Sequence, residues 1–259
     1  MSLKNTFHTS GLILFLAAIL LASCVPQKRI RYLQDLNETE EPGKEYKKAV
    51  PVDYRVNQGD NLYIKVNTLE DKSNYFDDLG GADNYYSESA IYLNSYTVND
   101  SGFVEFPLIG KVMVDNLTIG QIQKELQKKV DDYVKNTVVM VKLANFRVAL
   151  LGEFRNPGKY VVYQDKINIF EAIAMAGDIS NFGKKDRVLL TRQSEKGIKT
   201  YRVNLNDNSI LESELYYLMP NDLIYVEPMK GKPFAFTEFP YLLILTTITT
   251  TVLLIDYFK

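Results

Sequence analysis

Apolar and polar residues alternate where the chain first shows a regular pattern. The period of two over residues 61–66 places alternate side chains on one face and predicts a β-strand. Residues 96–98 and 103–106 flank a turn-forming stretch, 99–102, which predicts a β-hairpin. Residues 111–114 predict one further strand before the pattern changes.

A helical pattern follows. Thr118 and Gln121 have the spacing of a capping box, in which the hydroxyl and the amide bond the free backbone N–H groups of the first turn. Apolar residues then recur at helical intervals and predict one buried stripe, formed by Ile119, Ile122, Leu126, Val130 and Tyr133. The apolar run 137–143 predicts a buried strand after this helix.

A second group of elements begins near Phe146. Asn168 and Glu171 predict the start of another helix, and Gly177 can end it in a left-handed conformation. Strands are expected on both sides of this helix, at residues 148–151, 159–163, 187–191, 200–205 and 223–226. The sequence therefore predicts an α+β fold.

A short sequence motif is repeated in the two groups. Gly59-Asp60 and Asn221-Asp222 each form the end of a turn just before an apolar strand. Aspartates at such positions usually bond their own turn, so we interpret Asp60 and Asp222, together with Asp100, as structural residues.

The C-terminal segment is apolar. Residues 239–255 carry no charge, and aromatic residues flank them, so we expect a transmembrane helix within residues 234–258. Threonines occupy about half of its circumference and include the candidate pore-lining residues Thr246, Thr247, Thr250 and Thr251. This face could meet water or a neighbouring copy, or it could take part in ordinary helix packing.

The N-terminus is typical of a secretion signal. Lys4 precedes an uncharged apolar run, 11–22, and the sequence Leu21-Ala22-Ser23-Cys24 resembles the lipobox of bacterial lipoproteins. We therefore expect a signal peptide at residues 1–23 and a lipid on Cys24, with a polar tether over residues 24–50. The alternatives are a plain signal peptide with an incidental cysteine, or a buried free thiol.

The composition excludes several functions. The 30 Lys and Arg residues against 32 Asp and Glu leave a net charge of -2, so no basic field is available for nucleic acid. His8 is the single histidine and Cys24 the single cysteine, which excludes most metal and nucleophilic chemistry based on these residues. We expect no cofactor.

A Tyr-rich stretch within residues 68–93 has no clear periodicity and predicts a long loop. Its aromatic residues could stack on sugars or simply pack; they are Tyr75, Phe76, Tyr85 and Tyr86. Asp77, Asp78 and Glu88 raise a glycan hydrolase as an alternative. Carboxylates that cleave a glycosidic bond must flank it at set separations, and proximity in one loop is poor support for this. We expect no enzyme.

Residues from Tyr54 to about Pro228 resemble the polysaccharide biosynthesis/export family. The first part of the resemblance lies in 54–60, 102–110 and 115–118, which predict an export module at residues 51–145. The second lies in 152–158 and 171–177, which resemble a soluble-ligand-binding β-grasp module and place it at residues 146–229. Asn221 departs from the pattern, since a glycine is usual there.

The resemblance implies an outer-membrane subunit that exports capsular or extracellular polysaccharide. In that reading it forms a homo-oligomeric ring, octameric in known members, whose C-terminal helices make the membrane pore, and it works with an inner-membrane co-polymerase. The presence of one β-grasp module implies a shorter periplasmic reach than in larger members. The alternative is an outer-membrane lipoprotein scaffold that binds glycan or a partner protein and forms no pore.

Overall fold

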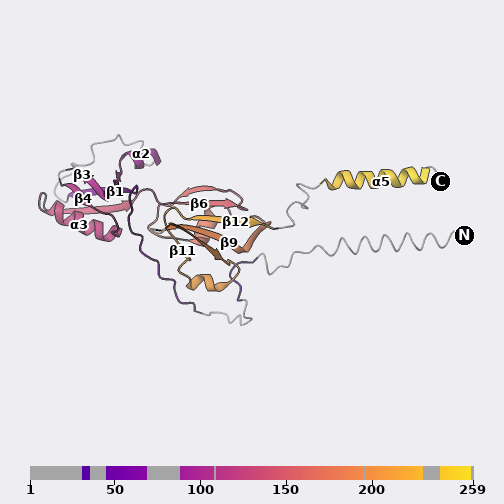
Figure 1. The fold of residues 1–259 in the computed structure, drawn as a ribbon, viewed down its shortest axis with the longest axis horizontal. Helices are drawn as coiled ribbons and strands as arrows, with labels where there is room; N and C mark the ends of the chain where they lie inside the picture. Colours follow the sequence, from indigo (N-terminus) through magenta and orange to yellow (C-terminus); the bar gives the residue numbers. More distant parts are fainter. Residues whose placement is uncertain are drawn as a thin grey trace.

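The fold is described from a computed structural model, at residues 31–35, 45–68, 88–107, 109–194, 197–229 and 240–257. It is a mixed α/β structure with several sheets, as the sequence predicts. Figure 1 shows two neighbouring units, with the helix α5 (Tyr241–Tyr257) beyond the second. Cys24 and the expected signal peptide lie outside the described residues, as do Tyr75, Phe76, Asp77, Asp78, Tyr85 and Tyr86.

The first unit has a three-stranded antiparallel sheet in the order β2-β1-β5, a separate hairpin of β3 and β4, and two helices. Its elements are β1 (Asn61–Thr68), α2 (Glu88–Leu93), β2 (Tyr96–Thr97), β3 (Phe103–Phe106), β4 (Gly110–Met113), α3 (Ile119–Asp131) and β5 (Thr137–Leu143). The side chains of Leu62 and Val66 on β1 meet Ile122 and Leu126 of α3 in one hydrophobic core.

The predicted hairpin pairs differently. Strand β3 pairs with β4, whereas β2 pairs with β1. The turn before β3 is held by Asn99, whose side-chain oxygen accepts from the N–H groups of Ser101 and Phe103. The turn role that we assigned to Asp100 thus belongs to its neighbour.

Helix α3 begins as predicted and ends earlier. The Thr118 hydroxyl accepts from the Gln121 N–H, and the Gln121 side chain accepts from the Thr118 N–H, so the capping box is confirmed. Tyr133 was wrongly included in the buried stripe, because the helix ends at Asp131 and the tyrosine is 65% exposed.

The outer edge of β5 is partly occupied by a side chain from α3. The Gln127 amide accepts from the Val139 N–H at 2.8 Å and donates to the Thr137 carbonyl at 3.0 Å. These are the two bonds that a residue of a neighbouring strand would make, so Gln127 protects an edge that could otherwise pair with another chain.

We expect Gln127→Leu to lower the free energy of unfolding by about 1–3 kcal/mol, because two backbone groups lose their partner. Denaturant unfolding measures this change, and light scattering measures self-association through the opened edge. Gln123→Leu is the matched control, since Gln123 is exposed on the same helix. Equal effects of the two substitutions would contradict the edge-protecting role.

The second unit is built on a five-stranded sheet in the order β10-β9-β12-β6-β7, with β12 and β6 parallel and the other pairs antiparallel. Its elements are β6 (Arg147–Gly152), β7 (Gly158–Val161), β8 (Ile167–Asn168), α4 (Ile169–Met175), β9 (Gly183–Ser194), β10 (Gly197–Val203), the 3-10 helix η2 (Asn208–Glu212), β11 (Tyr217–Leu218) and β12 (Leu223–Pro228). Ile169 and Ile173 of α4 pack against Leu150, Leu190 and Ile224 of the sheet.

The ends of α4 agree with the sequence. The Asn168 side chain accepts from the N–H groups of Phe170 and Glu171, and the Glu171 carboxylate accepts from the Asn168 N–H. Gly177 follows the helix in a left-handed conformation, with φ at 72°.

Helix α5 confirms that the C-terminal segment is helical, but the transmembrane prediction is not supported. The helix has 17 residues and is about 26 Å long, against roughly 30 Å for a bilayer core. Among the described residues, no helix has the length and apolar character needed to cross a membrane.

Candidate functional site

The two units meet along the segment 51–55, which has a cavity on each side. One cavity has a volume of 950 Å³ and reaches from this segment to the β9–β10 end and to Met219-Pro220-Asn221. The other has a volume of 620 Å³ and lies between α3, β5 and the loop that carries Asp165. Two exposed ion pairs cross between the units, Lys142–Asp165 at 2.8 Å and Lys166–Asp53 at 3.3 Å.

The larger cavity lies between two matching turns. In the first unit the Asp60 carboxylate accepts from the Asn57 N–H at 2.9 Å, and in the second unit the Asp222 carboxylate accepts from the Met219 N–H at 2.8 Å. The residue before each aspartate has positive φ, 83° at Gly59 and 66° at Asn221. The repeated sequence motif therefore corresponds to a repeated turn, and the structural role of both aspartates is confirmed.

The left-handed backbone at Asn221 explains why this residue can replace the glycine of the family pattern. A left-handed backbone favours glycine, and asparagine is among the few other residues that adopt it readily. The substitution keeps the turn and adds a carboxamide at the wall of the cavity.

Both aspartates are buried but have different partners. Asp60 accepts from the Tyr54 hydroxyl at 2.7 Å and from the Asn145 side chain at 3.2 Å, which ties the first turn to the connection between the units. Burial is the main cause that raises the pKa of the Tyr54 hydroxyl well above its ordinary value.

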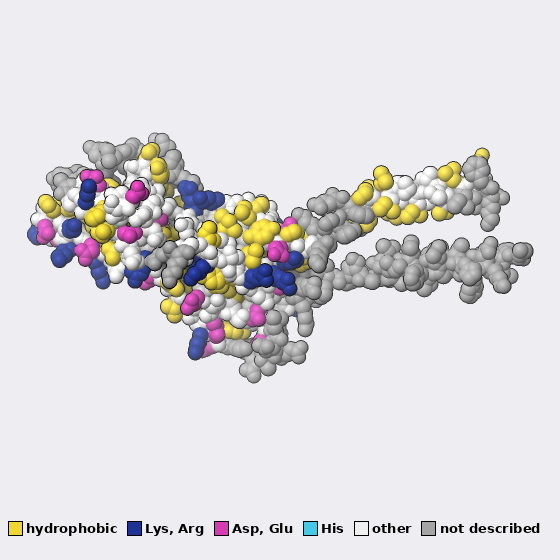
Figure 2. Space-filling model, in the orientation of Figure 1, with side chains coloured by type: hydrophobic (Ala, Val, Ile, Leu, Met, Phe, Trp, Pro, Cys, Tyr) yellow, Lys and Arg dark blue, Asp and Glu magenta, His cyan; other side chains and the backbone are white. Residues whose placement is uncertain are grey.

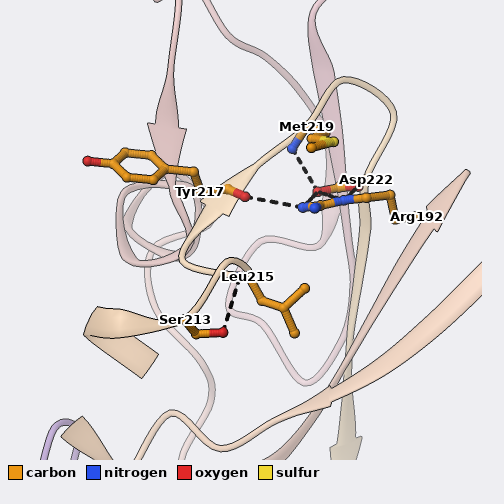
Figure 3. A network of polar contacts seen from close by, with 6 residues as sticks. All are labelled: Arg192, Ser213, Leu215, Tyr217, Met219 and Asp222. Atoms are coloured by element: carbon orange, nitrogen blue, oxygen red, sulfur yellow. Dashed lines mark hydrogen bonds and ion pairs between the residues drawn. The ribbon is translucent and has the colours of Figure 1, made fainter. Parts of the chain in front are cut away.

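Asp222 is fully buried and pairs with Arg192 (Figure 3). The guanidinium donates to both carboxylate oxygens, at 2.9 Å and 2.7 Å, and to the Tyr217 carbonyl at 3.1 Å. Burial raises the pKa of Asp222, while Arg192 and the Met219 N–H oppose the rise. The bidentate geometry matches an ionised carboxylate, so we assign the charged pair.

The expected tether contains residues that dock onto the second unit. Residues 31–35, here called the N-terminal arm, bond to the chain after β10: the Leu33 N–H donates to the Leu205 carbonyl at 3.1 Å and the Gln34 N–H to the Asn206 carbonyl at 2.6 Å. Nearer the first unit, the Lys47 N–H donates to Glu212 at 2.9 Å. These parts of residues 24–50 are thus bound to the body, in contrast to a free tether.

The arm is fixed by Tyr32. Its hydroxyl donates to Asp178, and the Lys185 ammonium lies 3.8 Å from the centre of its ring. Lys185 is buried, and burial is the main cause that lowers its pKa. Nothing in the sequence pattern marks this contact, because 146 residues separate Tyr32 from Asp178.

The threonines of α5 bond their own helix. Each hydroxyl donates to a carbonyl three or four residues earlier, as in Thr246 to Leu242 at 2.8 Å and Thr250 to Thr246 at 2.6 Å. The same holds for Thr247, Thr249 and Thr251. Figure 2 shows hydrophobic side chains exposed along this helix. The hydroxyl hydrogens are therefore used internally, and each oxygen keeps a lone pair for another donor.

The candidate site has no metal-binding arrangement in the part of the chain that the structure describes: no group of three or more His, Cys, Asp or Glu side chains is placed to hold an ion. Glu88 begins the short helix α2, while its proposed partners Asp77 and Asp78 lie outside the described residues.

Comparison with known proteins points to one family. Residues 48–144 match the family described as polysaccharide biosynthesis/export protein. The EPS I polysaccharide export outer membrane protein EpsA of Ralstonia nicotianae is 27% identical over 175 residues, covering 62% of this chain and 43% of that protein. The protein of the same name from Ralstonia solanacearum is 23% identical over 137 residues, covering 51% of this chain and 36% of that protein.

The chain thus spans less than half the length of these curated relatives. Both relatives are named outer membrane proteins, which supports an outer-membrane location for this chain. Its matched region, 48–144, includes the whole first unit from β1 to β5. By this match residues 48–144 are similar to the polysaccharide biosynthesis/export family.

Proposed function

We propose that this protein is a component of the apparatus that exports capsular or extracellular polysaccharide across the outer membrane. The observation that carries the proposal is the family match of residues 48–144. The two relatives named as polysaccharide export proteins also support it, with alignments that cover 62% and 51% of this chain. The role is transport by shape and surface, with no catalytic step.

The proposal includes a lipid anchor on Cys24. Seven residues separate this cysteine from Tyr32, the docked tyrosine of the arm. A chain extends by at most about 3.6 Å per residue, so the second unit would lie within about 30 Å of the lipid. The short connection favours a firm position near the membrane surface over a long reach.

We further propose a homo-oligomeric ring, octameric by resemblance to the family, that receives its polymer from an inner-membrane co-polymerase. In this assembly the face of α5 with Thr246, Thr247, Thr250 and Thr251 is turned toward water or toward a neighbouring copy, and its aliphatic face is turned away. The internal hydroxyl bonds support this arrangement, since they leave the helix surface compatible with close contact between copies.

The export role predicts loss of surface polysaccharide when the C-terminal segment is removed. Cells in which the gene is replaced by one encoding residues 1–233 should carry little polymer on their surface, measured by antibody or lectin binding, while the truncated protein accumulates to normal levels. Cys24→Ser, which keeps the shape of the side chain and removes the thiol that accepts lipid, should reduce export in the same assay.

Two controls separate the candidate functions. Ser23→Ala changes the neighbouring small residue and keeps the cysteine, so it should leave export unchanged. Retention of surface polymer by the truncated protein would favour the scaffold. Normal polymer in cells that lack the whole gene would reject both roles.

A further inference from the structure

Uncharged polar side chains are the largest group among the residues that line the larger cavity between the two units. Five carboxamides contribute to it, on Asn57, Gln58, Asn116, Gln193 and Asn221. The first three come from the first unit and the other two from the second. A ligand in this space would therefore contact both units at once.

Most of these carboxamides are available to a ligand. Among the described residues, the side chains of Gln58, Asn116, Gln193 and Asn221 make no hydrogen bond to the protein. A carboxamide offers two donors and one acceptor oxygen, and a sugar hydroxyl both donates and accepts. Several carboxamides around one cavity are thus a good match for a surface rich in hydroxyl groups.

The cavity carries charges of both signs, with one more carboxylate than cations. Arg55 and Lys199 contribute positive charge, and Asp53, Asp60 and Asp115 contribute negative charge. A phosphate-rich ligand would need an excess of cations, which the cavity does not offer, and its polar and charged residues outnumber the apolar Val52, Met219 and Pro220. Its volume of 950 Å³ falls within the range of small-molecule sites and leaves space for several sugar rings.

We propose that the cavity between the two matching turns, which contain Asp60 and Asp222, binds a short, hydroxyl-rich stretch of saccharide. This inference rests on the proposed function, because a polysaccharide export component meets such a ligand. The left-handed backbone at Asn116 and Asn221, with φ at 60° and 66°, directs one carboxamide from each unit at the cavity wall. Bound saccharide would then join the two units across the cavity.

The test is a binding measurement on the full chain in detergent. The probe is a set of short oligosaccharides released by mild acid hydrolysis from the surface polysaccharide of the cells that express the protein, and the readout is Kd by calorimetry. The double variant Asn116→Gly with Asn221→Gly removes both carboxamides, and glycine accepts the left-handed backbone without strain. Loss of two hydrogen bonds should weaken binding by about tenfold to thirtyfold.

Asn136→Gly is the matched control, because Asn136 also has a left-handed backbone, with φ at 59°, and lies outside the cavity. It should leave Kd unchanged. A second variant, Gln58→Ala with Gln193→Ala, touches two exposed side chains and should weaken binding without lowering the melting temperature. The same oligosaccharides with all hydroxyls methylated should not bind.

Unchanged Kd in both carboxamide variants, or failure of the parent chain to bind the probe, would overturn the saccharide site. Neither result would touch the export role, which the surface-polymer assay tests independently. Conversely, saccharide binding in a protein whose deletion leaves surface polymer intact would support the site and reject the export role.

Discussion

Replacing Arg192 by leucine should lower the free energy of unfolding by about 3–5 kcal/mol, because the buried Asp222 loses its partner. The carboxylate would keep only the Met219 N–H among the bonds shown in Figure 3. Thermal or denaturant unfolding of the full chain measures the effect. The double variant Arg192→Leu with Asp222→Asn removes the stranded charge and keeps an acceptor for Met219, so it should recover most of the loss.

The destabilisation should depend on pH in a defined direction. Burial raises the pKa of Asp222, and without Arg192 less opposes that rise. The folded variant then takes up a proton at higher pH than the unfolded chain, whose aspartate titrates near about 3.9. The loss of stability should therefore be largest above the folded-state pKa and shrink as the pH falls through it. A loss that stays constant between neutral and acid pH would contradict a buried, uncompensated carboxylate.

Gly152→Ala should cost about 3–5 kcal/mol of folding free energy. Gly152 ends β6 with φ at 88°, and a Cβ there would overlap the carbonyl oxygen of Val226 and press on the Tyr225 ring. That carbonyl accepts from the Glu153 N–H at 3.0 Å, so it cannot move without breaking a bond in the sheet. The unfolding midpoint of the variant measures the cost.

Gly120→Ala is the control for this substitution. Gly120 lies in α3, and a Cβ there would meet open space. The same added methyl group should raise stability by about 0.4–1 kcal/mol, because it restricts the unfolded chain and fits the helix. If the two substitutions change the folding free energy in opposite directions, the loss at Gly152 is due to its backbone conformation and the contacts of the added Cβ. Equal changes would contradict that explanation.

Local signals in the sequence predicted local structure well. The capping boxes at Thr118 and Asn168, the left-handed Gly177 and the strand at 61–66 depend on residues within a few positions of one another. Asp60 and Asp222 were identified as turn residues for the same reason, whereas the role expected of Asp100 is filled by Asn99. Strand pairing was harder to predict. Strand β2 pairs with β1 and not with β3, and no short sequence pattern encodes that pairing.

The long-range part of the candidate site could not be predicted. The cavity forms only where residues near 57 and 221 come together in space. Hydrophobic periodicity and helix-capping residues carry no information on such long-range contacts. The Arg192–Asp222 pair was missed because its 30-residue separation matches no helical or strand spacing. Helix α5, Tyr241–Tyr257, lies within the predicted range 234–258, whose remaining residues apart from Pro240 lie outside the described part of the chain.

The docked N-terminal arm has a consequence for how the protein can be divided. In space, residues 31–35 belong with the unit that is encoded last, although they are encoded before the first unit. A chimaera that exchanged residues 146–229 alone between two relatives would pair a foreign sheet with the original arm. Tyr32 would then face residues other than Asp178 and Lys185 wherever the relative differs there. Exchanges that carry both pieces together should give soluble hybrids more often, so this arm and this sheet should be inherited as one unit.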